Sequence, residues 1–294
     1  MSNSPTINPV VFTSSKAGPH LLVLGGVHGN EVCGPAAINH ILGLFSTGKI
    51  VMEAGSVTFV PICNPRAYAE NKRFIDRNLN RALAKRTEPK AYEEFLMNEL
   101  APLLEDCDVL LDIHSYRAGG PAFAFRGGDE LRMREEPFIA ALGLNHVIYG
   151  WSEAYAASGV KIDPIESVGT TEYARAHGAI ATTIECGQHL DASATPVAIR
   201  AIEGALAYLG IAKLPVPPRE GNLRRTRIKK LFYKQRAGSY VKAWKHLDEI
   251  IEGELIANFD DGEKITAPFT GRIVLPHADC PVGQEWFYLG IDES

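Results

Sequence analysis

The sequence has no uninterrupted apolar run that approaches the roughly 20 residues of a membrane-spanning helix. Its beginning, from Met1 to Thr6, also lacks the charged region and the apolar stretch of a secretory signal. We therefore expect a cytoplasmic protein that neither enters a membrane nor is exported.

Cysteine is scarce, and its spacing follows no metal-binding or redox pattern. The five cysteines are odd in number and widely scattered, and no pair has the spacing of a zinc knuckle or a thioredoxin-like site. We expect reduced thiols, most of them small core residues. The five are Cys33, Cys63, Cys107, Cys186 and Cys280.

Charge imbalance is also small. A formal net charge of −5, with 22% charged and 46% hydrophobic residues, is ordinary for a globular protein. Because there is no basic excess, we expect neither nucleic acid nor a membrane surface as a partner. The composition leaves homo-oligomerisation open. The 294 residues suffice for one large α/β domain with a small appendage, or for two modest domains.

Up to about residue 212, predicted strands alternate with predicted helices. Residues 21–27 form an apolar stretch that ends in glycine and valine, and residues 31–44 have apolar side chains at helical spacing. The alternation predicts an α/β fold with a mixed, mostly parallel sheet flanked by helices. Further strands are predicted at 56–62, 108–114, 122–126, 145–149 and 179–185, further helices at 90–104, 133–143, 167–177 and 195–209, and a polar loop at 64–81.

The pattern changes near residue 213. The proline-rich segment 214–218 cannot continue a helix and is typical of a linker. Short strand-like segments punctuated by glycine and proline follow it. We therefore predict an α/β domain over residues 1–212 and a small C-terminal all-β domain over residues 219–294. The strand-like segments are 239–244, 264–267, 271–275 and 285–290.

Two polar residues follow the predicted strand 21–27. His28 and Glu31 lie where α/β proteins usually bind ligands, beyond the carboxyl end of a strand. An imidazole and a carboxylate at this spacing can converge on one ion where a strand turns into a helix, and zinc accepts both. Taken alone, the pair is explained more simply by a core histidine and a glutamate that complements a helix dipole.

A second histidine, His114, ends the predicted strand 108–114. Asp112 lies two residues earlier and therefore on the same face, where it can orient an imidazole as an outer carboxylate. A buried Asp–His hydrogen bond without a metal is the alternative. Together with His28 and Glu31, the pattern favours a metal site.

Proton transfer and charge stabilisation have candidates as well. Glu185 ends the apolar strand 179–185, where burial raises a carboxyl pKa and suits the group to act beside a metal-bound water. An ion pair with a nearby arginine is the alternative. In the polar loop, Arg73 can stabilise an oxyanion, and a second arginine beside an asparagine can hold a carboxylate. A solvated face is the alternative for these arginines.

In combination, these blocks resemble the succinylglutamate desuccinylase/aspartoacylase family, a branch of the zinc carboxypeptidase-like enzymes. The resemblance implies one zinc ion per chain on His28, Glu31 and His114, with Glu185 activating water. It also implies that residues 1–212 are the catalytic domain and that the β domain covers the active site. The matching blocks are Gly26–Glu31, Arg73–Asp76, Leu79–Arg81, Asp112–His114, Ile184–Gly187 and Gln284–Tyr288.

The resemblance implies further roles. Arg73 is expected on the oxyanion, and Asn80 with Arg81 on the carboxylate end of the substrate. Arg175, ten residues before Glu185, corresponds to a substrate-binding arginine of aspartoacylases, with a solvent-facing helix residue as the alternative. Tyr288 corresponds to a tyrosine that closes over the substrate, with aromatic packing as the alternative.

The expected function is therefore zinc-dependent hydrolysis of a small N-acyl amino acid, or a similar small amide, to a carboxylate and an amine. A zinc metallocarboxypeptidase acting on peptides is the nearest alternative. A binding protein without catalysis and a metal-free α/β protein are the others. Thr171 stands where aspartoacylases have a tyrosine, and the segment 115–135 resembles neither succinylglutamate desuccinylase nor aspartoacylase. The sequence therefore does not identify the acyl group or the amino acid of the substrate.

Overall fold

The computed structural model describes residues 6–159, 163–219 and 221–293. The first five residues, on which the expected lack of a secretory signal largely depends, lie outside this part. Within it, no helix is both long and apolar enough to cross a membrane. All five cysteines are buried and free, as expected of core residues.

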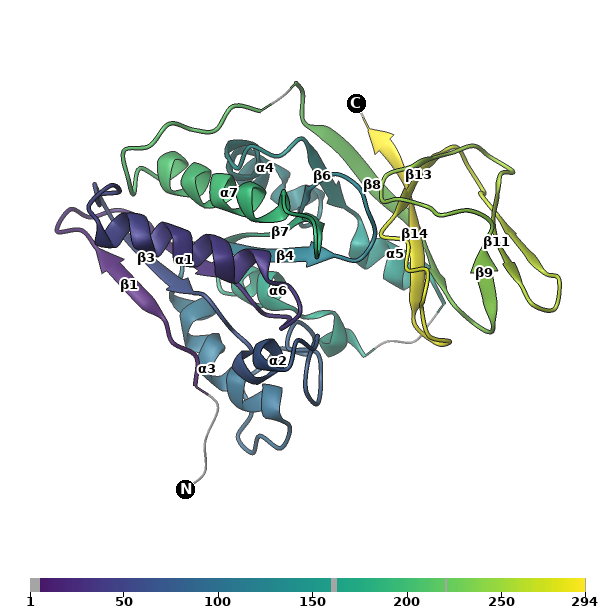
Figure 1. Ribbon diagram of the computed structural model, residues 1–294, viewed down its shortest axis with the longest axis horizontal. Coiled ribbons are helices and arrows are strands. Elements are labelled where there is room, and N and C mark those ends of the chain that lie inside the picture. The colour runs from purple at the N-terminus through teal and green to yellow at the C-terminus, as the bar shows by residue number, and fades with distance from the viewer. Residues whose placement is uncertain (1–5, 160–162, 220, 294) are drawn as a thin grey trace.

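An eleven-stranded mixed sheet runs through the molecule (Figure 1). Four neighbouring strands at its centre are parallel. Their sequences are largely apolar, because parallel strands are covered on both faces. Strands β1 and β5 are antiparallel to their neighbours β3 and β7, and β6 is parallel to β5. The strands are β1 (Val10–Thr13), β2 (His20–Leu24), β3 (Ser56–Val60), β4 (Val109–Tyr116), β5 (Phe123–Phe125), β6 (His146–Tyr149) and β7 (Ile180–Gln188).

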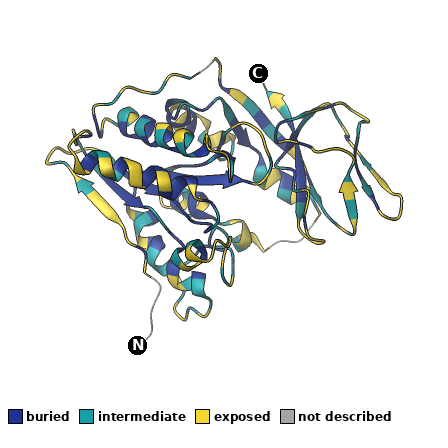
Figure 2. Cartoon of the chain, in the orientation of Figure 1, coloured by how far each residue is buried: buried dark blue, intermediate teal, exposed yellow. Residues whose placement is uncertain are grey.

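Helices cover both faces of this part of the sheet. Because side chains alternate along a strand, Leu21 and Val23 pack on one face of β2 and Leu22 and Leu24 on the other. Figure 2 shows the strands between the helices as almost continuously buried. One face carries α1 (Cys33–Ser46), α4 (Arg132–Ala141) and α7 (Ala194–Tyr208), and the other carries α3 (Tyr92–Asp106) and α6 (Thr170–Ala176).

The C-terminal strands extend the same sheet. β8 pairs in parallel with β6, and β14, β13 and β10 follow it in antiparallel order. A separate three-stranded sheet packs beyond them at the right of Figure 1. The strands are β8 (Arg224–Tyr233), β10 (Glu249–Ile250), β13 (Gly271–Val274) and β14 (Glu285–Glu293), and in the smaller sheet β9 (Gly238–Tyr240), β11 (Leu255–Phe259) and β12 (Lys264–Thr266).

The predicted α/β fold with a large mixed sheet is confirmed. Parallel pairings predominate only up to β7, and across the whole sheet antiparallel pairings are as frequent, because the C-terminal strands continue it. The described residues from 221 onward contain strands and no helix. A separate β domain over residues 219–294 stays a prediction. The remaining elements are α2 (Pro65–Ala69), α5 (Trp151–Ala157) and two 3-10 turns, Asp129–Leu131 and Pro164–Ser167.

Candidate active site

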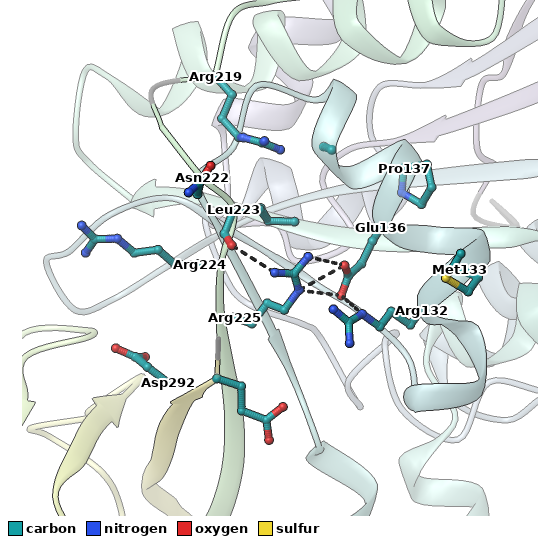
Figure 3. A pocket seen from close by; sticks show the side chains of 12 residues that line it. Arg132, Met133, Glu136, Pro137, Arg219, Asn222, Leu223, Arg224, Arg225 and Asp292 are labelled. Carbon is teal, nitrogen blue, oxygen red and sulfur yellow. Dashed lines mark hydrogen bonds and ion pairs between the residues drawn. The ribbon is translucent and has the colours of Figure 1, made fainter.

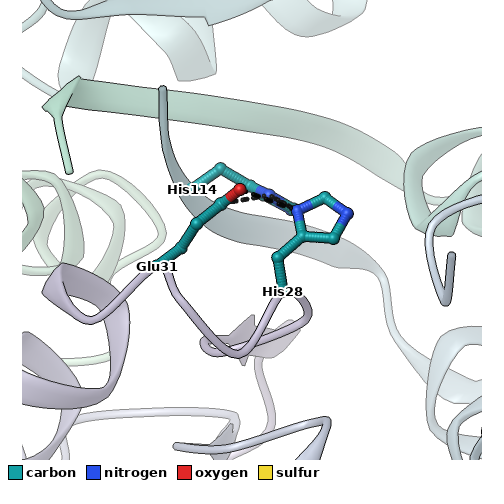
Figure 4. Close-up of side chains that lie close together, drawn as sticks. All are labelled: His28, Glu31 and His114. Atoms are coloured by element: carbon teal, nitrogen blue, oxygen red, sulfur yellow. Dashed lines mark hydrogen bonds and ion pairs between the residues drawn. The ribbon is translucent and has the colours of Figure 1, made fainter. Parts of the chain in front are cut away.

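Three buried side chains converge at the carboxyl edge of the central strands. His28 and Glu31 lie in the turn between β2 and α1, and His114 lies near the end of β4. Their potential ligand atoms lie within 4.8 Å of one another, and each residue is at most 3% exposed. Figure 4 shows both imidazole rings next to the carboxylate. The structure therefore brings the three predicted metal ligands together.

One nitrogen of each ring faces Glu31. Nδ1 of His28 and Nδ1 of His114 each lie 2.9 Å from a different oxygen of this carboxylate. Nε2 of His28 lies 2.9 Å from Asn78 Oδ1, which also accepts a hydrogen bond from the backbone N–H of Asn80. Because that second bond identifies the Asn78 atom as an acceptor, His28 carries its proton on Nε2 and presents the lone pair of Nδ1 to the group.

The outer side of His114 is held in a similar way. Its Nε2 lies 2.9 Å from Asp112 Oδ2, a short but poorly aligned contact with the carboxylate that the sequence singled out. The backbone N–H of Ser115 donates to Glu31 Oε2 at 3.1 Å. Outer partners of this kind orient metal-binding imidazoles. Two imidazole nitrogens and one carboxylate fit a catalytic zinc site, which takes three protein ligands and keeps one position open.

The protonation states of His28 and Glu31 suit a cation, whereas that of His114 does not. Burial lowers the pKa of His28 to about 4, helped by the charge of Arg73, so this ring is neutral. Burial alone would raise the pKa of Glu31, but the two histidines outweigh it and hold that pKa well below its usual range. Burial would lower the pKa of His114, but Asp112 and Glu31 raise it well above its usual value. A cation at this group therefore competes with a proton on His114.

Glu185 lies beside the group. It stands on β7, in register with His114 on β4. Its Oε2 is buried and has no hydrogen-bond partner in the described part of the chain. Burial, and then the charge of Glu31, raises the pKa of Glu185 to about 8. A carboxyl group with such a pKa can take up and release a proton near neutral pH.

A buried carboxylate shapes the arginine-rich loop. Glu93 of α3 is fully buried and accepts backbone N–H hydrogen bonds from residues 75–77. The loop held in this way directs Arg73 to the group, where its Nη1 donates to Glu31 Oε1 at 2.9 Å. The side chain of Arg73 remains 37% exposed. Arg73 is therefore next to the predicted metal ligands and is partly open to solvent.

Asn80 lies close behind the group. Its Oδ1 accepts a hydrogen bond from the backbone N–H of Thr170 at 2.8 Å. Its own backbone N–H is bound to Asn78, the partner of His28. The side-chain oxygen of Asn80 is thus already engaged within the protein, whereas its side-chain nitrogen has no hydrogen bond among the described residues.

Arg81 and Tyr288 belong to one polar cluster, although they are far apart in sequence. Burial would lower the pKa of Arg81, but the nearby Tyr155, Glu285 and Tyr288 outweigh it and hold that pKa above its usual value. The hydroxyl of Tyr288 donates to Glu285 Oε2 at 2.5 Å and lies 3.0 Å from the hydroxyl of Tyr155. A side chain of the C-terminal strands therefore lies near the predicted carboxylate-binding arginine.

Arg175 is not brought to this group. Its Nε and Nη2 donate to the two carboxylate oxygens of Glu135 at 2.7 and 3.1 Å. Its Nη2 also donates to the carbonyl of Ala181 at 2.8 Å, and its Nη1 to Glu172 at 3.1 Å. Ala181 lies near the beginning of β7, whereas Glu185 lies closer to its carboxyl end. The guanidinium of Arg175 thus joins α6 to α4 and β7.

Several polar residues near the group were not singled out from the sequence. Ser115 Oγ lies 2.8 Å from His189 Nδ1, just beyond β7. Arg117 Nη1 lies 2.7 Å from His277 Nε2, between β13 and β14. The position of Ser115 next to His114 was a signal in the sequence. No signal pointed to His277, because only the fold places its loop beside the end of β4.

A cavity of about 770 Å³ lies elsewhere, along α4 and the beginning of β8 (Figure 3). Arginines are prominent in its lining, but Arg225 is paired with Glu136 at 2.7 Å. None of the predicted site residues lines this cavity. It is therefore separate from the candidate site.

Two curated proteins match a part of the chain. The probable aspartoacylase of Prochlorococcus marinus subsp. pastoris is 34% identical over 103 residues, which are 33% of this chain and 34% of that protein. The probable aspartoacylase of Nostoc sp. is 27% identical over 105 residues, 33% of this chain and 35% of that protein. The matched segments thus span about a third of the length of these relatives.

Solved structures share the fold over nearly the whole chain. The succinylglutamate desuccinylase/aspartoacylase from Rhodobacter sphaeroides has a TM-score of 0.79 at 18% identity, over 98% of this chain and 89% of that one. The product-bound ectoine utilization protein EutE (DoeB) from Ruegeria pomeroyi has a TM-score of 0.77 at 20% identity, over 96% and 88%.

A family model matches residues 17–209, which include all the predicted metal ligands and Glu185. The model describes the succinylglutamate desuccinylase/aspartoacylase catalytic domain. On this match, the chain belongs to the succinylglutamate desuccinylase/aspartoacylase family.

Proposed function

We propose that the chain is a zinc-dependent hydrolase that cleaves the amide bond of a small N-acyl amino acid, or a similar N-acyl compound, to a carboxylate and an amine. The observation that carries the proposal is the convergence of His28, Glu31 and His114, with Glu185 on the adjacent strand, whose Oε2 has no hydrogen-bond partner among the described residues. Membership in a family of deacylases supports it.

His28, Glu31 and His114 would hold the zinc ion. When bound, zinc supplies Lewis acidity at this position, which acidifies water and polarises a carbonyl group. A single ion per chain agrees with the single group of candidate ligands among the described residues.

Glu185 is the proposed acid and base. Its Oε2, which has no partner in the described part of the chain, would accept a proton from the attacking water. A pKa of about 8 would let Glu185 return that proton to the nitrogen of the leaving amine. Arg73, bound to Glu31 through one nitrogen, has further N–H donors for the oxyanion that develops on the acyl carbon.

Arg81, the side-chain nitrogen of Asn80 and Tyr288 are the proposed contacts for the carboxylate end of the substrate. Burial strengthens a guanidinium–carboxylate pair, because little water competes with it. Tyr288 comes from the C-terminal strands, and we infer that these strands limit access to small substrates. Arg175 is left out of the proposed set, since each of its three guanidinium nitrogens already donates a hydrogen bond within the protein.

The test is an amine-release screen with the zinc-loaded protein over acetyl, succinyl and other N-acyl amino acids, with peptides assayed in parallel. We expect turnover of at least one N-acyl amino acid and none of the peptides. Trimming of peptides alone would favour the metallocarboxypeptidase. A Glu185→Gln variant should keep its zinc and lose activity by roughly 10²- to 10⁴-fold. Full activity in that variant would contradict the role of Glu185.

A further inference from the structure

The two candidate metal-binding histidines are connected behind the site by a chain of polar contacts. From His28 the chain runs through Asn78 and Asn80, as described above. From His114 it runs to Asp112. The two branches meet at Thr170, the first residue of α6, which contacts both Asn80 and Asp112.

Thr170 closes the connection with two different groups. Its backbone N–H donates to Asn80 Oδ1 at 2.8 Å. Its hydroxyl lies 2.5 Å from Asp112 Oδ2 and 3.4 Å from Asn80 Oδ1, so the hydroxyl proton goes to the much closer carboxylate. Thr170 and Asp112 are both fully buried, so water does not compete for these bonds.

We propose that Thr170, with Asn80, is the positioning link of a ring that fixes both imidazoles for metal binding. The ring runs His28–Asn78–Asn80–Thr170–Asp112–His114 and closes through Glu31, which contacts both histidines. The inference rests on the zinc site of the proposed function. It gives Asn80 a role behind the metal ligands through its side-chain oxygen, in addition to any contact of its nitrogen with a substrate.

The physical reason lies in the burial of Asp112. Its Oδ1 has no partner in the described chain, so Oδ2 depends on the Thr170 hydroxyl and on the contact with His114. A buried oxygen that loses its hydrogen-bond donor is left unsatisfied, and the carboxylate is then no longer held in one orientation. Loss of the hydroxyl therefore weakens the group that orients His114, and metal affinity falls with it.

Gly169 provides a second, independent way to open the ring. A Cβ on Gly169 would lie 2.3 Å from Asn80 Oδ1. Its nearest neighbour is the end of a flexible side chain, so the protein can accommodate a methyl group by moving the amide of Asn80. That movement breaks the bond to Thr170 without removing any member of the ring.

The experiment measures zinc affinity of the full chain by competition with a chelator, independently of catalysis. We expect Thr170→Val and Gly169→Ala to bind zinc on the order of 10- to 100-fold more weakly than the wild type. Thr170→Ser, which keeps the hydroxyl, should restore most of the affinity. The matched control is Thr226→Val, because Thr226 is equally buried and donates to Asp292 at 2.7 Å, outside the ring.

The control separates positioning from general stability. If Thr170→Val destabilises the fold but binds zinc within twofold of the wild type, Thr170 is only structural and the proposal is wrong. Equal losses in Thr170→Val and Thr226→Val would also overturn it. A wild-type protein that takes up no zinc contradicts the proposed function itself, whereas tight zinc binding that is insensitive to Thr170 contradicts only the ring.

Discussion

Arg81 and Arg175, the two arginines predicted to bind the substrate, differ in their surroundings. Arg81 donates to a backbone carbonyl at 2.8 Å and lies near Glu285 within a cluster that includes Tyr288. Arg175 donates hydrogen bonds to Glu135, to Glu172 and to a backbone carbonyl of β7. All three guanidinium nitrogens of Arg175 already donate hydrogen bonds, and only one of its five N–H donors is left, so the loss of Arg175 should affect stability more than substrate binding.

Replacement of Arg175 tests this difference. Arg175→Gln leaves the buried carboxylate of Glu135 without its cation, and we expect the free energy of unfolding to fall by about 3 kcal/mol. The KM of the protein that remains folded should not change. Arg81→Gln is the comparison and should raise KM. Urea denaturation and steady-state kinetics check both, and a raised KM in folded Arg175→Gln would return Arg175 to the substrate site.

We expect the folded state to lose stability at acid pH partly through His246, a buried histidine outside the candidate site. Burial, and then the charge of His146, lowers the pKa of His246 to about 3, and its Nδ1 accepts the backbone N–H of Leu275 at 3.1 Å. Between pH 6.5 and 3 the unfolded chain binds a proton on His246 that the folded chain does not. Stability from this residue is therefore complete above pH 6.5 and lost as the pH falls.

His246→Gln keeps a hydrogen-bond acceptor but cannot take up that proton. Between pH 7 and 4.5 we expect the wild type to lose about 2–3 kcal/mol more unfolding free energy than the variant. Urea denaturation over a pH series measures this. Parallel pH profiles for the two proteins would contradict the prediction.

The candidate metal ligands and the residues that contact them show what a sequence can predict at this scale. His28, Glu31 and His114 were recognisable because in combination they matched a family pattern, although His28 and Glu31 alone did not indicate a metal. Asn78 and Thr170 were not, because amides in loops and threonines at helix beginnings are common for other reasons. Only the fold brings Thr170 to Asn80, across 90 residues of sequence.

At the scale of elements, the central strands were predictable and β8 was not. The segments 21–27, 108–114 and 179–185 correspond to β2, β4 and β7, because an apolar run indicates a buried strand without knowledge of its partners. In β8, the buried Ile228 stands among charged residues, and Arg225 is satisfied by Glu136 of α4. Without that distant partner, such a segment has the pattern of a solvated one.

The turn that joins β2 to α1 depends on a close approach at Gly29. A Cβ at Gly29 would lie 2.1 Å from the backbone carbon of Ala67 in α2, so a larger residue must displace backbone. At Gly43, on the exposed side of α1, an added Cβ would meet no atom within 4 Å. Replacement by alanine should therefore destabilise the protein at Gly29 and stabilise it at Gly43.

We expect Gly29→Ala to lower the free energy of unfolding by about 1–3 kcal/mol and to weaken zinc binding, because the displaced turn carries His28 and Glu31. Gly43→Ala should raise the free energy of unfolding by about 0.5–1 kcal/mol, since alanine is a better helix former than glycine. Denaturant unfolding and chelator competition measure both effects. A Gly29→Ala protein as stable as the wild type would show that the turn can move freely.

At the scale of the whole molecule, the C-terminal strands share a core with the α/β part. One buried cluster contains Phe123 and Ile148 from the α/β part together with Ile228, Val274 and Tyr288 from the C-terminal strands. β8 also forms the continuation of the sheet beyond β6. The sequence pattern changes near residue 213, but the core and the sheet continue across this point.

Truncation after residue 218 tests whether the predicted domain over residues 1–212 is independent. Without β8 and β14, the shortened chain exposes the edge of β6 and the apolar side chains of the shared cluster, which favours aggregation. We expect the fragment to be insoluble or to lack a cooperative unfolding transition. Addition of a separate 219–294 fragment should restore part of its solubility and of its cooperative unfolding. A soluble fragment that unfolds cooperatively and binds zinc like the full chain would instead establish residues 1–212 as a domain in its own right, and would make the C-terminal strands a cover over a site that forms without them.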